Sequence, residues 1–311
     1  IREHFQTKTE VWPDAMKDAF GKEFSHVNSE NLLLSAKRLL SIQRGRNKEN
    51  PDLHERPDDR EALSSKYLTS TEDFIVEAIG KKAWEIDRKV QQRIDKEDRT
   101  ISNIFSPRTY NVVINSVFDK AQRPDQMNPL QMLSGYVRTT IRGKEFGGIG
   151  SGQVNVDAAK QINPTHLGFL DTIQTPESED TGIALHLPLG VQVERAPDRP
   201  GRLSAGHVIR TKAYDRKTKK WVMVTPSALE REHVAFPDQV KWQGQTPVPV
   251  ADDVICYDAG RQQTKQPWNK VRYILPSSKA LFSFSANLIP FLQNNNGNRA
   301  MTAAKQQEQA V

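Results

Sequence analysis

The segment Asn163-Pro164-Thr165-His166-Leu167-Gly168, followed by Ile173-Gln174-Thr175-Pro176-Glu177 and Gly182-Ile183, lies near the middle of the chain. It shows little hydrophobic periodicity and many turn-forming residues, so its information lies in residue identity rather than in a secondary-structure pattern. We interpret it as a packed, functional loop. An ordinary buried turn with two helix-breaking prolines is the alternative that this segment alone leaves open.

Composition limits the classes of protein that the chain can represent. Its 311 residues can bury a sizeable core and are expected to form two or three modules. No apolar run reaches the roughly 20 residues of a membrane span, so we expect no membrane partner. The single Cys256 excludes an internal disulfide and a Cys-based zinc site. A net charge of +6 favours a polyanionic partner, although a merely soluble basic protein is the alternative.

The first third of the sequence predicts helices. Ser29 is an N-cap candidate, and Leu33, Ala36 and Leu40 lie at helical spacing, which predicts a core helix. A capping box of the form Thr69-x-x-Glu72 predicts the start of a long amphipathic helix. Its apolar face consists of Ile75, Ile79, Ala83, Ile86, Val90 and Ile94. A shorter apolar segment follows between residues 101 and 118.

From Leu187 onward the apolar period changes to two, which predicts strands. These strands are expected at residues 191–193, 207–213, 221–225, 254–257 and 271–275. The basic run from Tyr214 to Lys220 is interpreted as a hairpin tip. A solvated edge turn is its default reading, and a phosphate contact is the alternative. The predicted fold class is therefore α+β, with several domains.

Three segments together resemble one protein family. The central segment resembles the signature PTH-x-G … ETPEG … GL of the beta (second-largest) subunit of multisubunit DNA-directed RNA polymerases. The run from Ala121 to Leu130 resembles the beta-subunit motif S-Q-F-M-D-Q-x-N-P-L. The segments 286–292, 298–301 and 307–311 resemble A-S-L-I-P-F-L … A-N-R-A-L-M-G-x-N-M-Q-R-Q-A-V. In addition, Asp58-Asp59-Arg60 resembles the DDRDH element of the same subunits.

The resemblance implies roles for individual residues. Gln122, Asp125 and Arg138 fall on positions beside the RNA–DNA hybrid, and Lys144 lies in a glycine-rich stretch that suits the fork loop near melted DNA. Arg299 falls on an arginine that approaches the triphosphate of the incoming nucleotide. Its guanidinium suits that role because its fixed fork of donors can engage phosphate oxygens.

Glu177 is implied near the nucleotide-addition site. His166 is instead expected to be a structural hydrogen-bonding histidine, because the sequence offers it no H-x-x-x-H pair and no cysteine partner for a metal.

The sequence departs from the family pattern at several positions. The first glutamate of ETPEG is replaced by Gln174, and Glu308 falls on a family arginine and reverses its charge. Gly135 replaces a family histidine. The polar detail of the site is therefore expected to differ from the family even where the spacing is kept.

No catalytic residue is assigned to this chain. It contains no D-x-D-x-D cluster, and the resemblance implies that Mg²⁺ is held mainly by a partner subunit carrying the aspartates. The expected organisation has four parts. Residues 1–100 form a helix-rich, lobe-like region, residues 101–186 the fork and hybrid-binding region, residues 187–280 a beta-rich module, and residues 281–311 an active-site-proximal segment.

The resemblance also implies partners. These are the C-terminal half of a beta subunit, a beta-prime-like largest subunit that could itself be split, the DNA template, the RNA transcript and NTPs. The chain opens on Ile1 and stops where the family continues. We therefore expect a split beta subunit of a giant-bacteriophage RNA polymerase, inactive alone, in the cytoplasm of an infected bacterial host or in the virion. A truncated piece of a longer beta subunit is the rival explanation.

Two other classes of function are considered. A non-catalytic nucleic-acid-binding or virion structural protein could retain the beta-subunit fold. A hydrolase built on His166 and Glu177 lacks a nucleophile motif and is disfavoured.

Overall fold

The computed structural model describes residues 11, 16–17, 20–45, 59, 61–95, 107–118, 121, 125–143, 150, 157–196, 204–257 and 263–310. The chain divides into two compact units. The first comprises residues 1–58, 69–121 and 195–206, and the second comprises residues 59–68, 122–194 and 207–311. Each unit is described by itself. The expected division into four parts stays a prediction.

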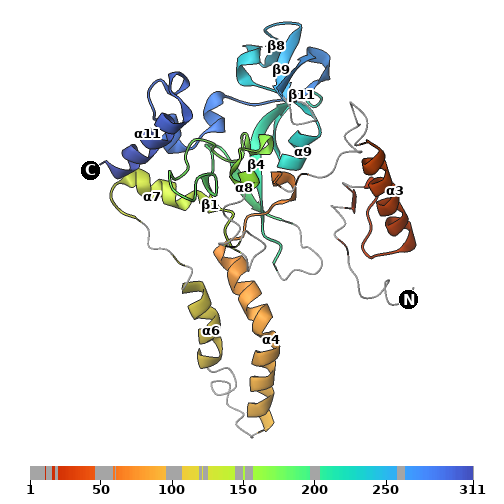
Figure 1. Cartoon of the computed structure of the whole chain (residues 1–311), viewed down its shortest axis with the longest axis vertical. Helices are drawn as coiled ribbons and strands as arrows, with labels where there is room; N and C mark the ends of the chain where they lie inside the picture. Colours follow the sequence, from red (N-terminus) through yellow and green to blue (C-terminus); the bar gives the residue numbers. More distant parts are fainter. Residues whose placement is uncertain are drawn as a thin grey trace. The chain divides into compact units, whose positions relative to one another are not determined.

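The first unit contains three long helices. These are α3 (Ser29–Gly45), α4 (Thr71–Asp95) and α6 (Pro107–Phe118), and α4 and α6 run side by side (Figure 1). The helices expected from periodicity are therefore present. Both predicted N-caps, however, are displaced by one residue. Asn28 rather than Ser29 caps α3, because its Oδ1 accepts the Asn31 N–H at 2.8 Å.

The start of α4 shows the same displacement. The Ser70 N–H and hydroxyl donate to Asp73 Oδ2 at 2.8 and 3.1 Å, so Ser70 and Asp73 occupy the positions predicted for Thr69 and Glu72. The other Asp73 oxygen accepts a hydrogen bond from Ser204. Asp73 is only 3% exposed, and these donors compensate the cost of burying its carboxylate.

The prediction that residues 29–45 form a core helix is wrong within the described part of the chain. Leu33 is 72% exposed and Leu40 is 53% exposed. Helical periodicity identifies an apolar stripe, but it does not identify what covers that stripe. The apolar face of α4 is likewise only partly covered, because Ile75 and Ile79 are each 40% exposed.

The second unit is built around a seven-stranded sheet with the order β10-β9-β6-β11-β4-β3, in which β5 also pairs with β4. Its strands are β3 (Gln192–Arg195), β4 (His207–Asp215), β5 (Lys220–Val224), β6 (His233–Ala235), β9 (Asp253–Tyr257), β10 (Gln263–Pro267) and β11 (Val271–Ile274). The period-two segments of the sequence are thus confirmed as strands. Ala213, Val254, Cys256 and Ile274 pack inside, each 0% exposed.

Two further strand pairs belong to this unit. The strands β7 (Val240–Gln243) and β8 (Thr246–Pro249) form a hairpin, and β1 (Arg138–Thr140) pairs with β2 (Ala184–His186). The β4–β5 pair closes the basic turn that the sequence predicts as a hairpin tip.

Further helices connect and flank these strands. They are η2 (Leu63–Ser65), α7 (Pro129–Tyr136), α8 (Asp157–Lys160), η5 (Pro164–His166), α9 (Pro226–Glu230), η6 (Pro237–Gln239), η7 (Trp268–Lys270), η8 (Ser278–Leu281), α10 (Phe284–Asn287), η9 (Leu292–Asn294) and α11 (Gly297–Gln309). The fold class is α+β, as the sequence predicts. Within the described ranges no helix is long and apolar enough to cross a membrane.

Candidate functional site

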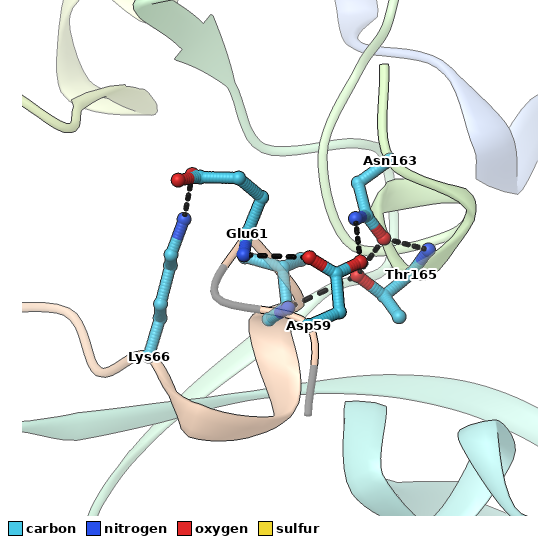
Figure 2. Close-up of polar contacts among 6 residues, drawn as sticks. Asp59, Glu61, Lys66, Asn163 and Thr165 are labelled. Atoms are coloured by element: carbon cyan, nitrogen blue, oxygen red, sulfur yellow. Dashed lines mark hydrogen bonds and ion pairs between the residues drawn. The ribbon is translucent and has the colours of Figure 1, made fainter. Parts of the chain in front are cut away.

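The central segment begins with a hydrogen-bonded junction to residues far earlier in the chain (Figure 2). Asn163 Nδ2 donates to Asp59 Oδ2 at 2.7 Å, across 104 residues of sequence. Thr165 Oγ1 donates to Asn163 Oδ1 at 2.7 Å and accepts the Leu63 N–H at 3.0 Å. Asp59, the second aspartate of the DDR element, is therefore part of the support of the central loop.

Both sides of this junction are held locally. Asp59 Oδ1 accepts the Glu61 N–H at 2.9 Å, and Glu61 forms an ion pair with Lys66 at 2.8 Å (Figure 2). Asn163 also caps η5 by accepting the Thr165 N–H at 3.0 Å. Asn163 and Thr165 are 8% and 9% exposed, so the contacts between them and with the Leu63 N–H are shielded from water, whereas the Glu61–Lys66 ion pair is only partly buried. The interpretation of this segment as a packed loop is confirmed.

The end of the segment requires glycine. Gly182 has φ +74°, and a Cβ atom at this position would lie 2.4 Å from the Lys160 carbonyl oxygen. Its N–H donates to Thr175 Oγ1 at 2.8 Å, and that hydroxyl donates to the Ala184 carbonyl at 3.0 Å. The threonine of the TPE sequence thereby closes the turn that leads into β2.

A buried carboxylate connects the middle of the segment to the C-terminal part of the chain. Asp171 is 0% exposed, and its Oδ1 accepts the Ile173 N–H at 2.7 Å. Its Oδ2 accepts the Ser283 N–H at 2.7 Å, and Ser283 is the N-cap of α10. Asp171 therefore fixes the position of α10 relative to the loop.

The β1–β2 pair joins the loop to the segment that begins near Asp125. Arg138 lies opposite His186 in the ladder, and Thr140 lies opposite Ala184. The His186 ring is buried, and its Nδ1 lies 2.9 Å from the Gln174 carbonyl oxygen. Because a carbonyl only accepts, His186 donates from Nδ1. Burial lowers the pKa of His186, so the ring stays neutral below its ordinary pKa.

Two of the positions at which the sequence departs from the family pattern, Gln174 and Glu308, contact each other. Gln174 Nε2 donates to Ser134 Oγ of α7 at 2.7 Å and also hydrogen-bonds Glu308 of α11. Ser285 Oγ of α10 donates to the same Glu308 oxygen at 2.8 Å. A glutamate at position 174 would repel Glu308, whereas the amide of Gln174 donates to it. The charge reversal at Glu308 is thus matched by the loss of charge at Gln174.

Asn128 makes a second connection between α7 and α11. Its Oδ1 caps α7 by accepting the Gln131 N–H at 2.8 Å. Its Nδ2 donates to the carbonyl oxygens of Gln307 and Ala310 at 2.9 and 2.8 Å. The asparagine of the N-P-L sequence therefore satisfies orphan groups at the start of one helix and the end of another.

Arg299 and Glu177 are both exposed. Arg299 belongs to α11, and Glu177 contacts this helix from the central segment. Asn296 caps this helix by accepting the Arg299 N–H at 2.9 Å, which places the arginine in the first turn. Glu177 accepts a hydrogen bond from Thr302, one turn further along the same helix. Among the described residues no carboxylate pairs with the Arg299 guanidinium. Its donors, together with the positive end of α11, face solvent and suit an anionic ligand.

The remaining predicted contacts divide into two groups. Asp125 and Arg138 are exposed, at the start of the α7 segment and on β1. Gln122 and Lys144 lie outside the described residues. The structure therefore brings the segments of Arg138, Glu177 and Arg299 into one packed unit, and it leaves the charged groups themselves at the surface.

His166 has the properties of a buried neutral histidine. Burial is the main cause that lowers its pKa to about 4, and the nearby Lys66 charge lowers it further, against the opposing carboxylates of Glu61 and Asp59. Its backbone N–H donates to Asn163, and its carbonyl accepts from Phe169 and Leu170. Within the described residues no three His, Cys, Asp or Glu side chains form a metal site.

Sequence reasoning missed several residues that assemble this site. Asp171, Ser134 and Ser285 carry contacts between segments but lie outside the fixed letters of the motifs, and Thr302 does so at a position where the family motif has a methionine. An aspartate side chain often accepts the backbone N–H two residues further along the chain. The sequence Asp171-Thr172-Ile173 could therefore have indicated the local contact of Asp171.

Comparison with known proteins gives the same class as the motifs. Residues 122–193 match the family model described as RNA polymerase Rpb2, domain 3. This match covers the second motif from Gln122 onward, the β1–β2 pair and the whole central segment.

Individual relatives extend the similarity over most of the chain. The chain is 24% identical over 266 residues to the DNA-directed RNA polymerase subunit beta of Mycoplasmopsis pulmonis. The aligned region covers 82% of this chain and 21% of that protein. The chain is 23% identical over 290 residues to the subunit of the same name from Methylacidiphilum infernorum, covering 91% of this chain and 21% of that protein. The chain therefore spans about a fifth of the length of these relatives and is similar to a segment of RNA polymerase beta subunits.

Proposed function

We propose that the chain is part of a multisubunit DNA-directed RNA polymerase, in which it forms walls of the RNA–DNA hybrid and nucleotide-entry regions. The observation that carries this proposal is the convergence of three distant motif segments on one network. Side-chain hydrogen bonds that span 134, 112 and 179 residues of sequence join three parts of the chain, namely residues 128 and 134, residues 163–186 and residues 283–310. The segments of this chain that resemble beta-subunit motifs thus form one connected structure rather than independent turns.

The surface chemistry of this network fits the proposed ligands. Arg138 on β1 and Arg299 in the first turn of α11 are exposed cations. Guanidinium groups bind phosphate oxygens through paired donors, so Arg138 suits a nucleic-acid backbone and Arg299 suits a nucleotide triphosphate. Glu177 has a supporting role in this proposal, because its contact is to Thr302 on the helix that presents Arg299.

The remaining components are proposed on the same resemblance. The C-terminal part of a beta subunit and a beta-prime-like largest subunit would complete the enzyme, and Mg²⁺ would be held mainly by that largest subunit. The metal would position the triphosphate and stabilise the charge that develops during nucleotidyl transfer. A split subunit of a giant-bacteriophage enzyme, acting in an infected bacterial cell or carried in the virion, stays a prediction from the sequence.

A purification from the native source tests the proposal. We expect the tagged chain to copurify with a largest subunit that carries an aspartate cluster, and the particle to extend RNA on a DNA template with Mg²⁺ and NTPs. We expect the isolated chain, in the same assay, to give no extension. Template-directed synthesis by the rigorously purified chain alone would contradict its role as one wall of a larger site. A particle without polymerase subunits would favour the non-catalytic nucleic-acid-binding or virion structural alternative.

A further inference from the structure

The beta-rich part of the second unit carries an exposed aromatic pair that no motif includes. Trp221 on β5 and Trp242 on β7 stack with ring centroids 5.4 Å apart and planes 28° apart. They remain 41% and 36% exposed. The buried Tyr214 lies edge-on to both rings, at 5.4 and 5.0 Å, and so supports the pair from below.

One lysine lies over this pair, and three more lie in the adjoining turn. Lys212 shares a strand face with Tyr214, and its ammonium nitrogen lies 5.3 Å from the centroid of the Trp221 ring. The turn between β4 and β5 adds Lys217, Lys219 and Lys220, all exposed. Lys220 is the neighbour of Trp221 in β5, so its side chain starts from the opposite face of the strand. Among the described residues no carboxylate pairs with these three ammonium groups. We call Lys217, Lys219 and Lys220 the lysine turn.

The lysine turn has a fixed base. Asp215 Oδ1 accepts the Lys217 N–H at 2.9 Å. The guanidinium of Arg216 lies 3.8 Å from the centroid of the Trp268 ring and donates to the Trp268 and Val271 carbonyls, each at 2.5 Å. The neighbouring Arg216 thus makes contacts within the fold, whereas the three lysine ammonium groups form no ion pair with a described residue. An ordered turn that presents unpaired cations loses little conformational entropy when it binds a polyanion.

We propose that Trp221, Trp242, Lys212 and the lysine turn form a binding surface for single-stranded nucleic acid. The exposed part of the aromatic pair contacts an unstacked base, and the ammonium groups contact the phosphates on either side. Flat aromatic faces beside cations are the chemistry that binds single strands without sequence preference. A duplex cannot use the indole face because its bases are already stacked. This surface lies on elements outside the motif network, so it does not rest on the proposed function.

Binding by the full chain tests the proposal. The probes are fluorescently labelled oligo(dT), oligo(rU) and a duplex, each of about ten nucleotides or base pairs, which is within the site size of single-strand-binding folds. We expect tighter binding of the single strands than of the duplex, with quenching of tryptophan fluorescence. Comparison of oligo(dT) with oligo(rU) distinguishes DNA from RNA as the preferred strand. Equal affinity for the duplex would overturn the proposal.

Two sets of variants separate stacking from general charge. The triple variant Lys217→Gln, Lys219→Gln, Lys220→Gln should reduce the slope of log affinity against log salt by about 2, because each phosphate contact to a single strand contributes about 0.7. The matched control Lys265→Gln, Lys270→Gln, Lys279→Gln removes the same charge from other exposed positions of the same unit. We expect the control to change the slope by less than half as much, and an equal effect of both triples would overturn the proposal.

The aromatic part is tested at Trp221. Trp221→Leu should weaken single-strand binding about five- to 150-fold, the range measured for loss of one stacked base. Trp221→Phe should retain most of the affinity, because a smaller aromatic face can still stack. Unchanged binding by Trp221→Leu would overturn the stacking role. The lysine variants keep the test decisive if Trp221→Leu fails to fold, because they alter only exposed side chains.

Discussion

Gln174 shows how a single residue can adapt a motif to its surroundings. The family pattern has a glutamate at this position, and this chain has an amide that donates to both Ser134 and Glu308. Glu308 itself replaces a family arginine. Each substitution by itself would be expected to disrupt the contacts of the site. In the fold, however, the two side chains form one hydrogen-bonded pair. The contact explains the charge reversal that the sequence alone leaves without a reason.

His166 makes a residue-scale prediction about pH. Its pKa in the folded chain is lowered to about 4, whereas an unfolded histidine has a pKa of about 6.5. Below pH 6.5 the unfolded state therefore binds a proton that the folded state does not. The stability from this group is fully present above pH 6.5 and is lost as the pH falls toward 4. Between pH 7 and pH 5 the loss amounts to about 2 kcal/mol.

NMR titration of the ring protons measures this pKa, and His166→Gln assigns the resonance. We expect the His166 signal to stay that of a neutral imidazole at pH 5.5, while the same histidine in the urea-unfolded chain titrates near 6.5. His166→Gln should also flatten the fall in unfolding free energy between pH 7 and pH 5. A folded-state midpoint above 6 would contradict the buried environment described for this loop.

At the scale of elements, α7 and α11 depend on one asparagine. Asn128 caps α7 and donates to the last carbonyls of α11. Asn128→Ala should destabilise both helices, by about 2 kcal/mol for the cap and the two hydrogen bonds together. Hydrogen exchange of residues 129–136 and 297–309 measures the effect, and we expect faster exchange in both segments.

Two variants separate the cap from the connection. Asn128→Ser keeps an acceptor for the Gln131 N–H but cannot reach both α11 carbonyls, so it should speed exchange mainly in α11. Asn296→Ala removes only the cap of α11, since its Oδ1 accepts the Arg299 N–H. We expect this variant to leave α7 unchanged. Slower or unchanged exchange of α11 in Asn128→Ala would show that the two helices are not coupled through this side chain.

Elements were easier to predict from the sequence than their burial. The periodicity of α3, α4 and the strands β4, β5, β9 and β11 is a local property, so the sequence alone identifies these elements. The exposed leucines of α3 could not be foreseen, because burial depends on what packs against the helix. The helix α11 was also missed, since Met301 is the one large apolar side chain among its small and polar residues.

At the scale of the molecule, the motifs could be identified from sequence and their convergence could not. Contacts such as those of Asn163 with Asp59 and Asp171 with Ser283 join residues more than 100 positions apart. Nothing in the local pattern specifies such pairs. The resemblance to beta subunits grouped the motifs by family, and the fold supplies the physical reason: buried polar side chains of one segment satisfy backbone groups of another.

We propose that this network presents Arg299 to a nucleotide triphosphate. The most direct test is nucleotide kinetics of the assembled enzyme with Arg299→Ala and Arg299→Lys, using Lys305→Ala, another exposed cation of α11, as the matched control. Loss of a charged hydrogen bond to phosphate is worth roughly 1.5–3 kcal/mol, so kcat/KM should fall about ten- to a hundredfold in Arg299→Ala. Arg299→Lys should be intermediate, because a point charge lacks the guanidinium fork, and Lys305→Ala should be close to wild type. Unchanged kcat/KM in a correctly assembled Arg299→Ala enzyme would contradict the account.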